Sequence, residues 1–380
     1  MRQKVAIIDP LGAHGSSHHY YLFGQSSGLI NASVEVNLYT NEITSNPEIK
    51  GLIFHQFYNK IYSNGNRILR AFRYIIGSVR SIFHAKISGS KICHFHIFHP
   101  NLLNLVDCLL VKILSMKLVY TIHDVISFDD KMSNKKLNKW LFKRADKLLT
   151  HNSFSRKILL ENYYLTDVEI VPHGNYIPFV TLNVDKSISR KKIGIDESKK
   201  VLLFFGMIKK NKGLDILLKS LNEVIKNNQD LVLVIAGRSW KDDFSFYQKI
   251  INDNKLSDYC IIHNHFISHE DVKFYYSAAD LVVLPYTRIY QSGVLMMSMS
   301  YNKPVLVSDL DPLIEVIVDN VTGYVFKNGS PSSLSAKLNY IFENFEDLYM
   351  INDKGREFII NHYDWKIIGQ KTSEVYKNLL

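Results

Sequence analysis

The feature that most constrains this chain is the alternation of short apolar runs, rich in β-branched and aromatic residues, with longer helical patterns. Strands that are apolar along their whole length and separated by helices are typical of parallel sheets covered on both faces. The runs form two series, which predict two doubly wound α/β domains. The expected strands are Lys4–Asp9, Val34–Thr40, Lys91–Phe98, Lys117–Asp124, Lys147–Asn152, Val168–Pro172, Lys200–Gly206, Asp230–Gly237, Tyr259–Asn264, Asp280–Pro285, Pro304–Asp309 and Gly323–Phe326.

The chain length of 380 residues agrees with two domains, because domains commonly hold about 100–200 residues each. The polar stretch Pro178–Lys200 separates the two series and is predicted to link them. We therefore expect the N-terminal domain to cover residues 1–178. In such sheets ligands bind beyond the carboxyl ends of the strands, so the informative residues should directly follow the expected strands.

The positive charge is concentrated in the first half of the chain. Residues 1–180 hold 21 basic and 12 acidic side chains, whereas the remainder holds 25 and 24. No acidic residue occurs from Gly51 to Val106. Such a surface attracts an anionic membrane, a nucleic acid or a phosphorylated acceptor. The basic residues of this stretch are Lys60, Arg67, Arg70, Arg73, Arg80, Lys86 and Lys91.

Two helical patterns in the first half are both basic and amphipathic. Asn66–Phe83 carries an apolar stripe with arginines opposite and beside it, and Lys131–Arg144 repeats the pattern. Such helices suit an anionic membrane surface. The alternative is an ordinary pair of helices that pack on the sheet and keep their arginines solvated. No aromatic and basic module typical of nucleic-acid binding occurs, so nucleic acid is not an expected partner.

The three cysteines lie far apart, which argues against a disulfide framework and fits a reducing compartment. No apolar run reaches the ~18–20 residues that span a bilayer. The N-terminus has the pattern of a first strand entering a turn rather than that of a signal peptide. We therefore expect a cytoplasmic protein that contacts the membrane only peripherally.

Two expected helix starts in the second half suit a diphosphate. Gly206 ends a strand, Lys209 and Lys212 follow, and a helix begins near Gly213. Gln291, Ser292 and Gly293 precede a second helical run that starts at Val294. A helix N-terminus offers backbone amides and partial positive charge to an anion. The alternative for the first segment is a basic turn with solvated lysines. Gly237 ends the neighbouring expected strand.

In the first half, Gly12 and Gly15 form a strand-to-helix loop that could approach a ligand closely. Three nearby histidines, His14, His18 and His19, suggest a metal site, but we see no carboxylate or cysteine partner for them and expect no metal.

His123 ends an expected central strand and could bind a hydroxyl or transfer a proton. Alternatively, its ring is satisfied by backbone groups. Asp124 could orient His123 or only cap the following turn.

The order of these segments resembles the GT-B glycosyltransferases of family 4, known as glycosyl transferases group 1. The resemblance covers essentially the whole chain. The matching segments are Asp9–Gly15, the strand end TIHDV at His123, ADKLLTHNSFSRKILL over Ala145–Leu160, IVPHG over Ile170–Gly174, GMIKKNKGLD over Gly206–Asp215, the IAG strand end at Gly237, VKFYYSAADLVVLPY over Val272–Tyr286, NKPV over Asn302–Val305, Glu315–Tyr324, and the last helix with Tyr363, Trp365 and Tyr376.

This resemblance implies two Rossmann-like domains facing across a cleft: residues 1–178 bind the acceptor, and residues 179–362 bind the nucleotide sugar. A helix over residues 363–380 crosses back to the first domain. The implied reaction is a metal-independent, retaining transfer from a UDP- or GDP-sugar to a lipid-linked or saccharide acceptor, with no further cofactor, in the synthesis of surface polysaccharide or glycolipid.

The resemblance also implies roles for single residues. His123 would contact the transferring sugar, and Lys209 and Lys212 would neutralise the diphosphate with help from the amides of Gly293 and Val294. Gly206, Gly237, Gln291 and Ser292 would line the donor side. Gly12, Gly15 and His173 would line the acceptor side.

The sequence departs from the family at the donor helix. The family carries a Glu-x7-Glu pair there, whereas no acidic residue occurs from Thr287 to Ser308. Gln291 and either Met297 or Ser298 occupy the approximate positions, and Glu315 could compensate in part. This departure leaves two alternatives open. One is a sugar-nucleotide epimerase on the same fold, and the other is a non-catalytic binding or scaffold subunit.

Overall fold

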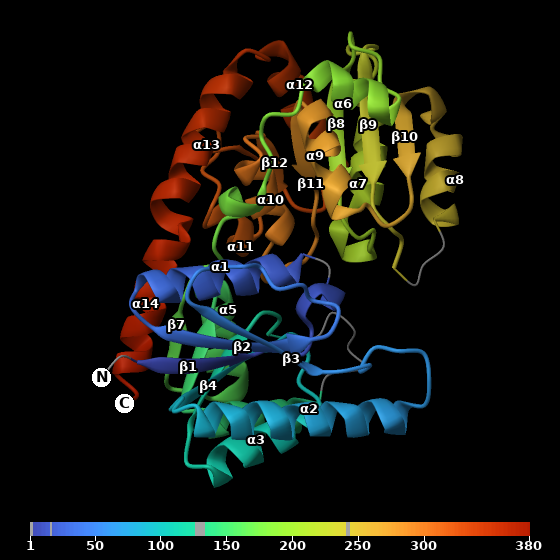
Figure 1. Ribbon diagram of the computed structural model, residues 1–380. Coiled ribbons are helices and arrows are strands. Elements are labelled where there is room, and N and C mark those ends of the chain that lie inside the picture. Colours follow the sequence, from blue (N-terminus) through green and yellow to red (C-terminus); the bar gives the residue numbers. More distant parts are fainter. Residues whose placement is uncertain (1–2, 16, 126–133, 241–243) are drawn as a thin grey trace. The chain divides into compact units, whose positions relative to one another are not determined.

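The computed structural model describes residues 3–15, 17–125, 134–240 and 244–380. They form two compact units (Figure 1). Unit 1 consists of Met1–Gly174 and Tyr363–Leu380, and unit 2 consists of Asn175–His362. The division therefore falls at Gly174, four residues before the boundary that the sequence suggested.

Unit 1 contains a sheet of seven parallel strands in the order β3-β2-β1-β4-β5-β6-β7. The strand order reverses between β1 and β4, and the carboxyl ends at such a switch point are where parallel sheets bind ligands. The strands are β1 Lys4–Ile8, β2 Glu35–Asn41, β3 Leu52–Tyr58, β4 Ile92–Ile97, β5 Lys117–Ile122, β6 Lys147–Thr150 and β7 Val168–Ile170.

Helices cover both faces of this sheet. Figure 1 shows α1 and α14 on one side and α2 and α3 on the other. Among the residues that the structure describes, no helix combines the length and apolar character needed to cross a bilayer. The helices of unit 1 are α1 His18–Asn31, α2 Arg67–Ile87, α3 Leu103–Ile113, α4 Lys135–Arg144, α5 Ser153–Tyr163 and α14 Trp365–Lys377, with the 3-10 turn η1 at Gly12–Gly15.

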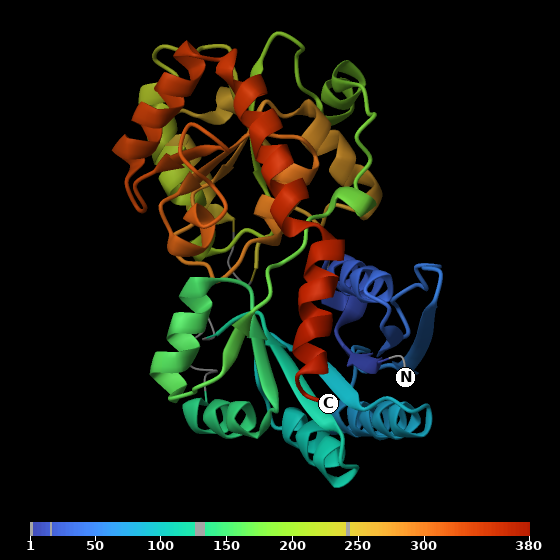
Figure 2. The same ribbon diagram turned by 90° about the vertical axis from the view of Figure 1, so that its left-hand side faces the viewer.

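The final helix α14 belongs to unit 1, where it packs against α1, as both views show (Figures 1 and 2). The contact is close because it is made by glycines. A Cβ atom at Gly28 would lie 2.0 Å from the carbonyl oxygen of Trp365, and one at Gly369 would lie 2.1 Å from the backbone of Gly28. The two helix backbones therefore touch.

Unit 2 contains six parallel strands in the order β10-β9-β8-β11-β12-β13. Its core forms where these strands meet the apolar faces of α7 and α12, with Leu217, Leu221, Leu334 and Leu338 fully buried. The strands are β8 Lys200–Phe205, β9 Leu231–Ala236, β10 Cys260–His263, β11 Leu281–Leu284, β12 Val305–Ser308 and β13 Tyr324–Phe326. The helices are α6 Lys186–Ile193, α7 Leu214–Val224, α8 Ser245–Asp253, α9 His269–Ala278, α10 Gly293–Ser300, α11 Asp311–Ile314, α12 Pro331–Glu343 and α13 Asp347–Tyr363, with 3-10 turns η3 Ile177–Phe179, η4 Lys210–Lys212 and η5 Ser257–Tyr259.

Each of the twelve expected strands is present, and the prediction of two parallel sheets is confirmed. The edge strand β3 was not predicted. The linker prediction for Pro178–Lys200 was wrong, because this stretch forms part of unit 2. It contains α6, where the nearly buried guanidinium of Arg190 pairs with Asp280 at 2.8 Å. Most polar side chains of this stretch are exposed on the surface of unit 2, while Ser189 and Arg190 of α6 are buried.

Candidate functional site

Six buried histidines of unit 1 gather at the carboxyl ends of its strands. His94 and His96 lie on β4, and His123 and His151 directly follow β5 and β6. Each of the six has less than a tenth of its surface exposed. Neighbouring rings are in contact, from His94 to His96, His123, His151 and His173, with His18 of α1 packed on His96 and His123. The cluster therefore occupies the switch point at which a ligand site is expected.

A line of ring nitrogens runs through this cluster. His96 Nδ1 lies 3.0 Å from His123 Nε2, and His123 Nδ1 lies 3.1 Å from His151 Nε2. His151 Nδ1 donates to the carbonyl of Val171 at 2.9 Å, and His96 Nε2 lies 3.0 Å from Gln25 Oε1. Both nitrogens of His123 thus face other histidines, so a sugar hydroxyl could reach a ring nitrogen only by replacing one of these contacts.

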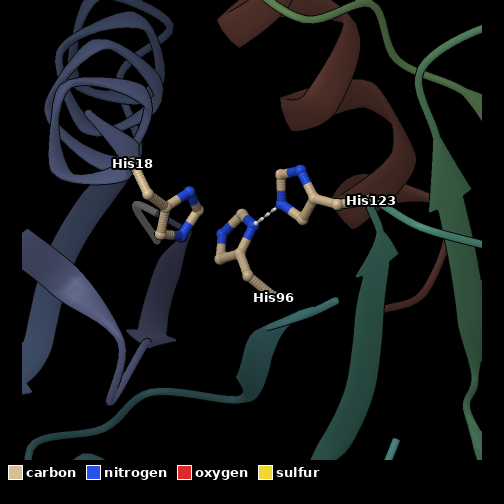
Figure 3. A group of neighbouring side chains, drawn as sticks. All are labelled: His18, His96 and His123. Carbon is tan, nitrogen blue, oxygen red and sulfur yellow. Dashed lines mark hydrogen bonds between the residues drawn. The ribbon is translucent and has the colours of Figure 1, made fainter. Parts of the chain in front are cut away.

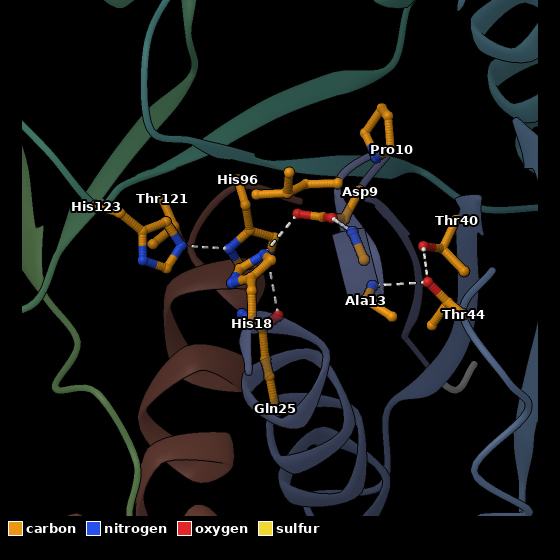
Figure 4. Close-up of polar contacts among 12 residues, drawn as sticks. Asp9, Pro10, Ala13, His18, Gln25, Thr40, Thr44, His96, Thr121 and His123 are labelled. Atoms are coloured by element: carbon orange, nitrogen blue, oxygen red, sulfur yellow. Dashed lines mark hydrogen bonds and ion pairs between the residues drawn. The ribbon is translucent and has the colours of Figure 1, made fainter. Parts of the chain in front are cut away.

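Partners at the edge of the cluster hold the outer rings (Figure 4). Asp9, directly after β1, places Oδ2 at 2.8 Å from His18 Nε2, while its Oδ1 accepts from the amide of Gly12 at 2.7 Å. His94 lies 2.5 Å from the hydroxyl of Tyr376. The first loop and α14 therefore both position the histidines.

Burial makes most of these rings neutral. It lowers the pKa of His94 and His173 to about 3 each and that of His151 to about 4, with neighbouring histidines adding to each shift. Burial, followed by repulsion from nearby histidines, also holds the pKa of His96 and His123 well below the usual value. Neutral imidazoles suit hydroxyl groups or metal ions but do not attract a diphosphate by charge.

The predicted residues of unit 1 converge only in part. His123 occupies the centre of the cluster, with half-buried Asp124 beside it, and His173 lies at the rim. Gly12 is buried in η1, where a Cβ would lie 2.1 Å from Thr44 Oγ1, and Gly15 ends the same turn.

The grouping of His14, His18 and His19 was wrong. His14 is exposed and stacks on Tyr62, and His19 packs against Tyr20. Only His18 enters the cluster. The statement that no carboxylate lies near these histidines was also wrong, because Asp9 contacts His18.

Sequence reasoning missed His94, His96 and His151. The first two are spaced by two residues in an apolar strand, which places them on one face. His151 ends its strand as His123 does. These two signals could have indicated a cluster before the structure was known.

The predicted donor residues of unit 2 meet at the carboxyl ends of β8 and β9. A Cβ atom at Gly237 would lie 1.8 Å from the carbonyl oxygen of Gly206, and one at Gly206 would lie 3.3 Å from the side chain of Val294. Three predicted residues from separate segments are therefore neighbours. The absence of side chains at the two glycines allows the backbones of the two strand ends to approach each other closely.

The basic turn after β8 is tied to the loop after β11. The amino groups of Lys209 and Lys212 lie over the rings of Trp240 and Tyr286, at 4.7 and 3.7 Å from the ring centres. The backbone oxygen of Asn211 accepts from the amide of Thr287 at 2.9 Å. Aromatic contacts and a loop-to-loop hydrogen bond thus hold the two lysines at this edge.

The start of α10 completes this edge. Ser292 caps the helix by accepting from the amide of Leu295 at 3.1 Å, and half-buried Gln291 precedes it. Ser298 is fully buried, and its hydroxyl donates to the carbonyl of Val294 at 2.7 Å, so it does not replace a ligand-binding glutamate. Glu315 is exposed at the end of α11, beyond β12.

Two family models together match most of the chain. The model of Glycosyltransferase Family 4 matches residues 20–175, and that of Glycosyl transferases group 1 matches residues 185–358. The chain belongs to the group 1 glycosyltransferases. The recognition of this family from the sequence is confirmed.

The relatives are distant. The chain is 26% identical over 241 residues to a lipopolysaccharide 1,2-N-acetylglucosaminetransferase of Salmonella typhimurium, covering 61% of this chain and 62% of that enzyme. It is 24% identical over 207 residues to an uncharacterized glycosyltransferase of Methanocaldococcus jannaschii, covering 52% of this chain and 50% of the relative. The matches thus span less than two thirds of these two proteins.

Solved structures identify the fold. Sucrose-phosphate synthase of Thermosynechococcus elongatus matches with a TM-score of 0.79 at 16% identity, covering 100% of this chain and 99% of that chain. HepE of Anabaena, in complex with UDP and glucose, matches with a TM-score of 0.76 at 17% identity, covering 99% and 100%. The chain has the GT-B fold of these glycosyltransferases.

Proposed function

We propose that this glycosyltransferase transfers a sugar, with retention of configuration and without a metal ion in the chemical step, from a UDP- or GDP-sugar held by unit 2. The observation that carries the donor assignment is the meeting of Gly206, Gly237 and Val294 beside two lysines. The first amides of α10, at Gly293 and Val294, and the two ammonium groups suit a diphosphate that gains negative charge as it leaves. The solved complexes of HepE with UDP and with UDP-glucose support this choice of ligand.

Within unit 1, the proposed sugar contacts are His123 and Asp124. His123 exchanges one of its imidazole contacts for a hydrogen bond to a sugar hydroxyl. A neutral ring is suited to this, because it can both donate and accept. Gly12, Gly15 and His173 lie on the proposed acceptor side. The acceptor is a lipid-linked or saccharide substrate, as in the synthesis of surface polysaccharide or glycolipid.

Two matched variants separate donor binding from transfer. His123→Ala is expected to lower kcat/KM for transfer by about 100-fold or more, while the nucleotide Kd changes by less than about 3-fold. Lys212→Ala is expected to weaken nucleotide binding by about 10-fold or more, because it removes a charge-assisted contact. Calorimetry with the nucleotide and transfer assays with a panel of nucleotide sugars measure both effects.

Thermal unfolding and turnover assays decide between a glycosyltransferase, an epimerase and a non-catalytic subunit. Unfolding temperatures in the presence of UDP, GDP, ADP and CMP come first, and stabilisation by one nucleotide supports an enzyme. Stabilisation by none of the four would favour a non-catalytic subunit. Turnover of the nucleotide sugar without any acceptor would instead favour an epimerase. Unchanged transfer by His123→Ala would remove His123 from the site.

We propose further that the enzyme acts in the cytoplasm at an anionic membrane surface, which α2 contacts directly. This helix packs on its own unit through a face of mostly small side chains, with Gly77, Ser78, Ser81, Ile82 and Ala85 buried. Its apolar stripe faces away, with Ile68, Leu69, Phe72, Ile76, Val79, Phe83 and Ile87 each 42–77% exposed. The exposure of a stripe that a packing helix would ordinarily bury supports a contact with a surface outside unit 1.

The neighbouring α3 extends this exposed apolar surface with Leu109 and Ile113, which are 49% and 75% exposed. Basic residues of α2 border the stripe, and each contributes about 1 kcal/mol of attraction near anionic lipid. The second basic helix gives weaker support. It corresponds to α4, which begins at Lys135, and residues 131–133 lie outside the described part of the chain.

Replacing two exposed phenylalanines by aspartate tests this surface. The double variant Phe72→Asp and Phe83→Asp is expected to bind vesicles of mixed anionic and zwitterionic lipid at least about 10-fold more weakly, because two apolar side chains no longer enter the bilayer. Co-sedimentation measures the change. Ile188→Asp is the matched control, since this residue is 62% exposed on α6 of unit 2. Equal binding by both proteins would exclude α2 as the contact.

A further inference from the structure

Three histidines of unit 1 point toward one common space. One ring nitrogen each of His18, His96 and His123 lies within 4.8 Å of the others, and all three residues are buried. Figure 3 shows the three rings directed toward each other from α1, β4 and the end of β5. Neither the family match nor the proposed donor site assigns a role to this arrangement.

The hydrogen-bond partners of the three rings indicate which of their nitrogens are directed at this space as acceptors. His151 Nδ1 faces the carbonyl of Val171 and must carry the proton, so its Nε2 accepts from His123 Nδ1. A neutral His123 then has a lone pair on Nε2.

The same reasoning applies to the facing ring. With the Gln25 amide oriented as in the structure, its oxygen faces His96 Nε2, which then carries the proton and leaves a lone pair on Nδ1. This Nδ1 lies 3.0 Å from His123 Nε2. With these tautomers the two lone pairs face each other, and a cation beside both would remove their repulsion.

The ring of His18 also has one nitrogen held by an acceptor. His18 Nε2 lies 2.8 Å from the carboxylate of Asp9 and donates to it, which leaves Nδ1 as the ligand nitrogen. Each of the three rings thus has an acceptor behind it: Asp9 for His18, Gln25 for His96 and His151 for His123. Such outer partners fix the tautomer of metal-binding histidines and raise their basicity.

We propose that His18, His96 and His123 form a binding site for a divalent transition-metal ion, with Zn²⁺ the best fit. Three neutral imidazoles and an open fourth position are a common zinc environment. Tetrahedral zinc places its nitrogen ligands about 3.3 Å apart, so the 3.0 Å pair needs little change. The His18 ring closes the remaining gap by moving inward.

The effect of this ion on sugar transfer rests on the proposed function. An ion on His123 Nε2 competes with a sugar hydroxyl for the same lone pair. The ion is therefore an inhibitor of transfer rather than a participant in it. Binding of the ion itself does not depend on that function and can be measured without any substrate.

Metal titration of the full chain tests the proposal. After treatment with a chelator, the folded protein is titrated with Co²⁺ alone, and Zn²⁺ is then added as competitor. We expect one ion per chain, the visible absorption of four-coordinate Co²⁺, and its loss on addition of Zn²⁺. His96→Gln and His18→Gln should each weaken binding by more than about 100-fold, because loss of a ligand exceeds loss of an outer partner. His14→Gln, at an exposed histidine of the same segment, is the matched control.

The role of Gln25 gives an independent check that retains all three ligands. Gln25→Glu keeps an acceptor behind His96 and should preserve the affinity for Co²⁺, whereas Gln25→Leu should weaken it by about 10-fold or more. The opposite orientation of the Gln25 amide would place the proton on His96 Nδ1 and leave no site. Failure of the folded wild-type chain to bind Co²⁺, or equal binding by His96→Gln, would overturn the proposal.

Discussion

Gly213→Ala is expected to destabilise unit 2 by about 3 kcal/mol or more and to weaken nucleotide binding with it. Gly213 joins the basic turn η4 to α7 and has φ +68°, a left-handed conformation that costs other residues about 1–2 kcal/mol. A Cβ atom here would also lie 1.8 Å from the carbonyl oxygen of Pro285. The backbone of one of the two loops must therefore move.

The displaced loop carries the proposed phosphate contacts. Lys209 and Lys212 precede Gly213, and Tyr286, which holds Lys212, follows Pro285. Separation of the two loops thus breaks the edge that positions both lysines. Denaturant unfolding followed by calorimetry with the nucleotide measures the two losses together.

Gly194→Ala is the matched control. Gly194 lies in the same unit with φ +77°, but no atom lies within 4 Å of a Cβ built there. This variant therefore carries the conformational strain without the collision, and we expect a loss of about 1 kcal/mol and unchanged nucleotide binding. Equal stability of the two variants would show that the contact between Gly213 and Pro285 is not close in solution.

The strands could be predicted because burial on both faces requires apolar runs, which the sequence displays directly. The edge strand β3 does not follow this rule. Its residues are intermediate or exposed except for buried Tyr58, and they include His55 and Gln56, so no continuous apolar run marks it. The signal that remained was the enrichment of Leu52–Tyr58 in aromatic and branched residues after Gly51.

The histidine cluster could be predicted only in part, because it depends on strand order. The single apolar run Lys117–Asp124 was enough to predict that His123 lies at the end of a strand. Its meeting with His96 requires that β4 and β5 are neighbours and that their register pairs Ile97 with Ile122. His18 arrives from a helix rather than a strand. Pairing and register are set by tertiary packing and do not appear in any local pattern.

The orientation of α2 illustrates the same limit. The apolar stripe was recognised from the sequence, but a stripe alone indicates burial as readily as exposure. The deciding information was the opposite face, where Ile82 is buried and the small residues Gly77, Ser78, Ser81 and Ala85 allow close packing. A Cβ atom at Gly77 would lie 2.5 Å from the ring of Tyr58, so this face is closely packed.

Gly28→Val is expected to destabilise unit 1 by about 3 kcal/mol or more, because two helix backbones touch at this position. The new Cβ would lie 2.0 Å from the carbonyl oxygen of Trp365. Because this oxygen belongs to the backbone, no side-chain rotation can relieve the collision. We therefore expect α14 to separate from α1, which limited proteolysis of the C-terminal segment detects.

The loss extends beyond the helix contact, because α14 supports the histidine cluster. Tyr376 lies 2.5 Å from His94, and the ring of Trp365 packs edge-on against Tyr21 at 5.1 Å between centres. Separation of α14 exposes rings that burial keeps neutral, so the cluster loses its arrangement together with the helix. Ser27→Val, at a half-buried position one residue earlier in α1, adds the same side chain without the collision. A Gly28→Val protein as stable and as protease-resistant as Ser27→Val would show that α14 is not docked through these glycines.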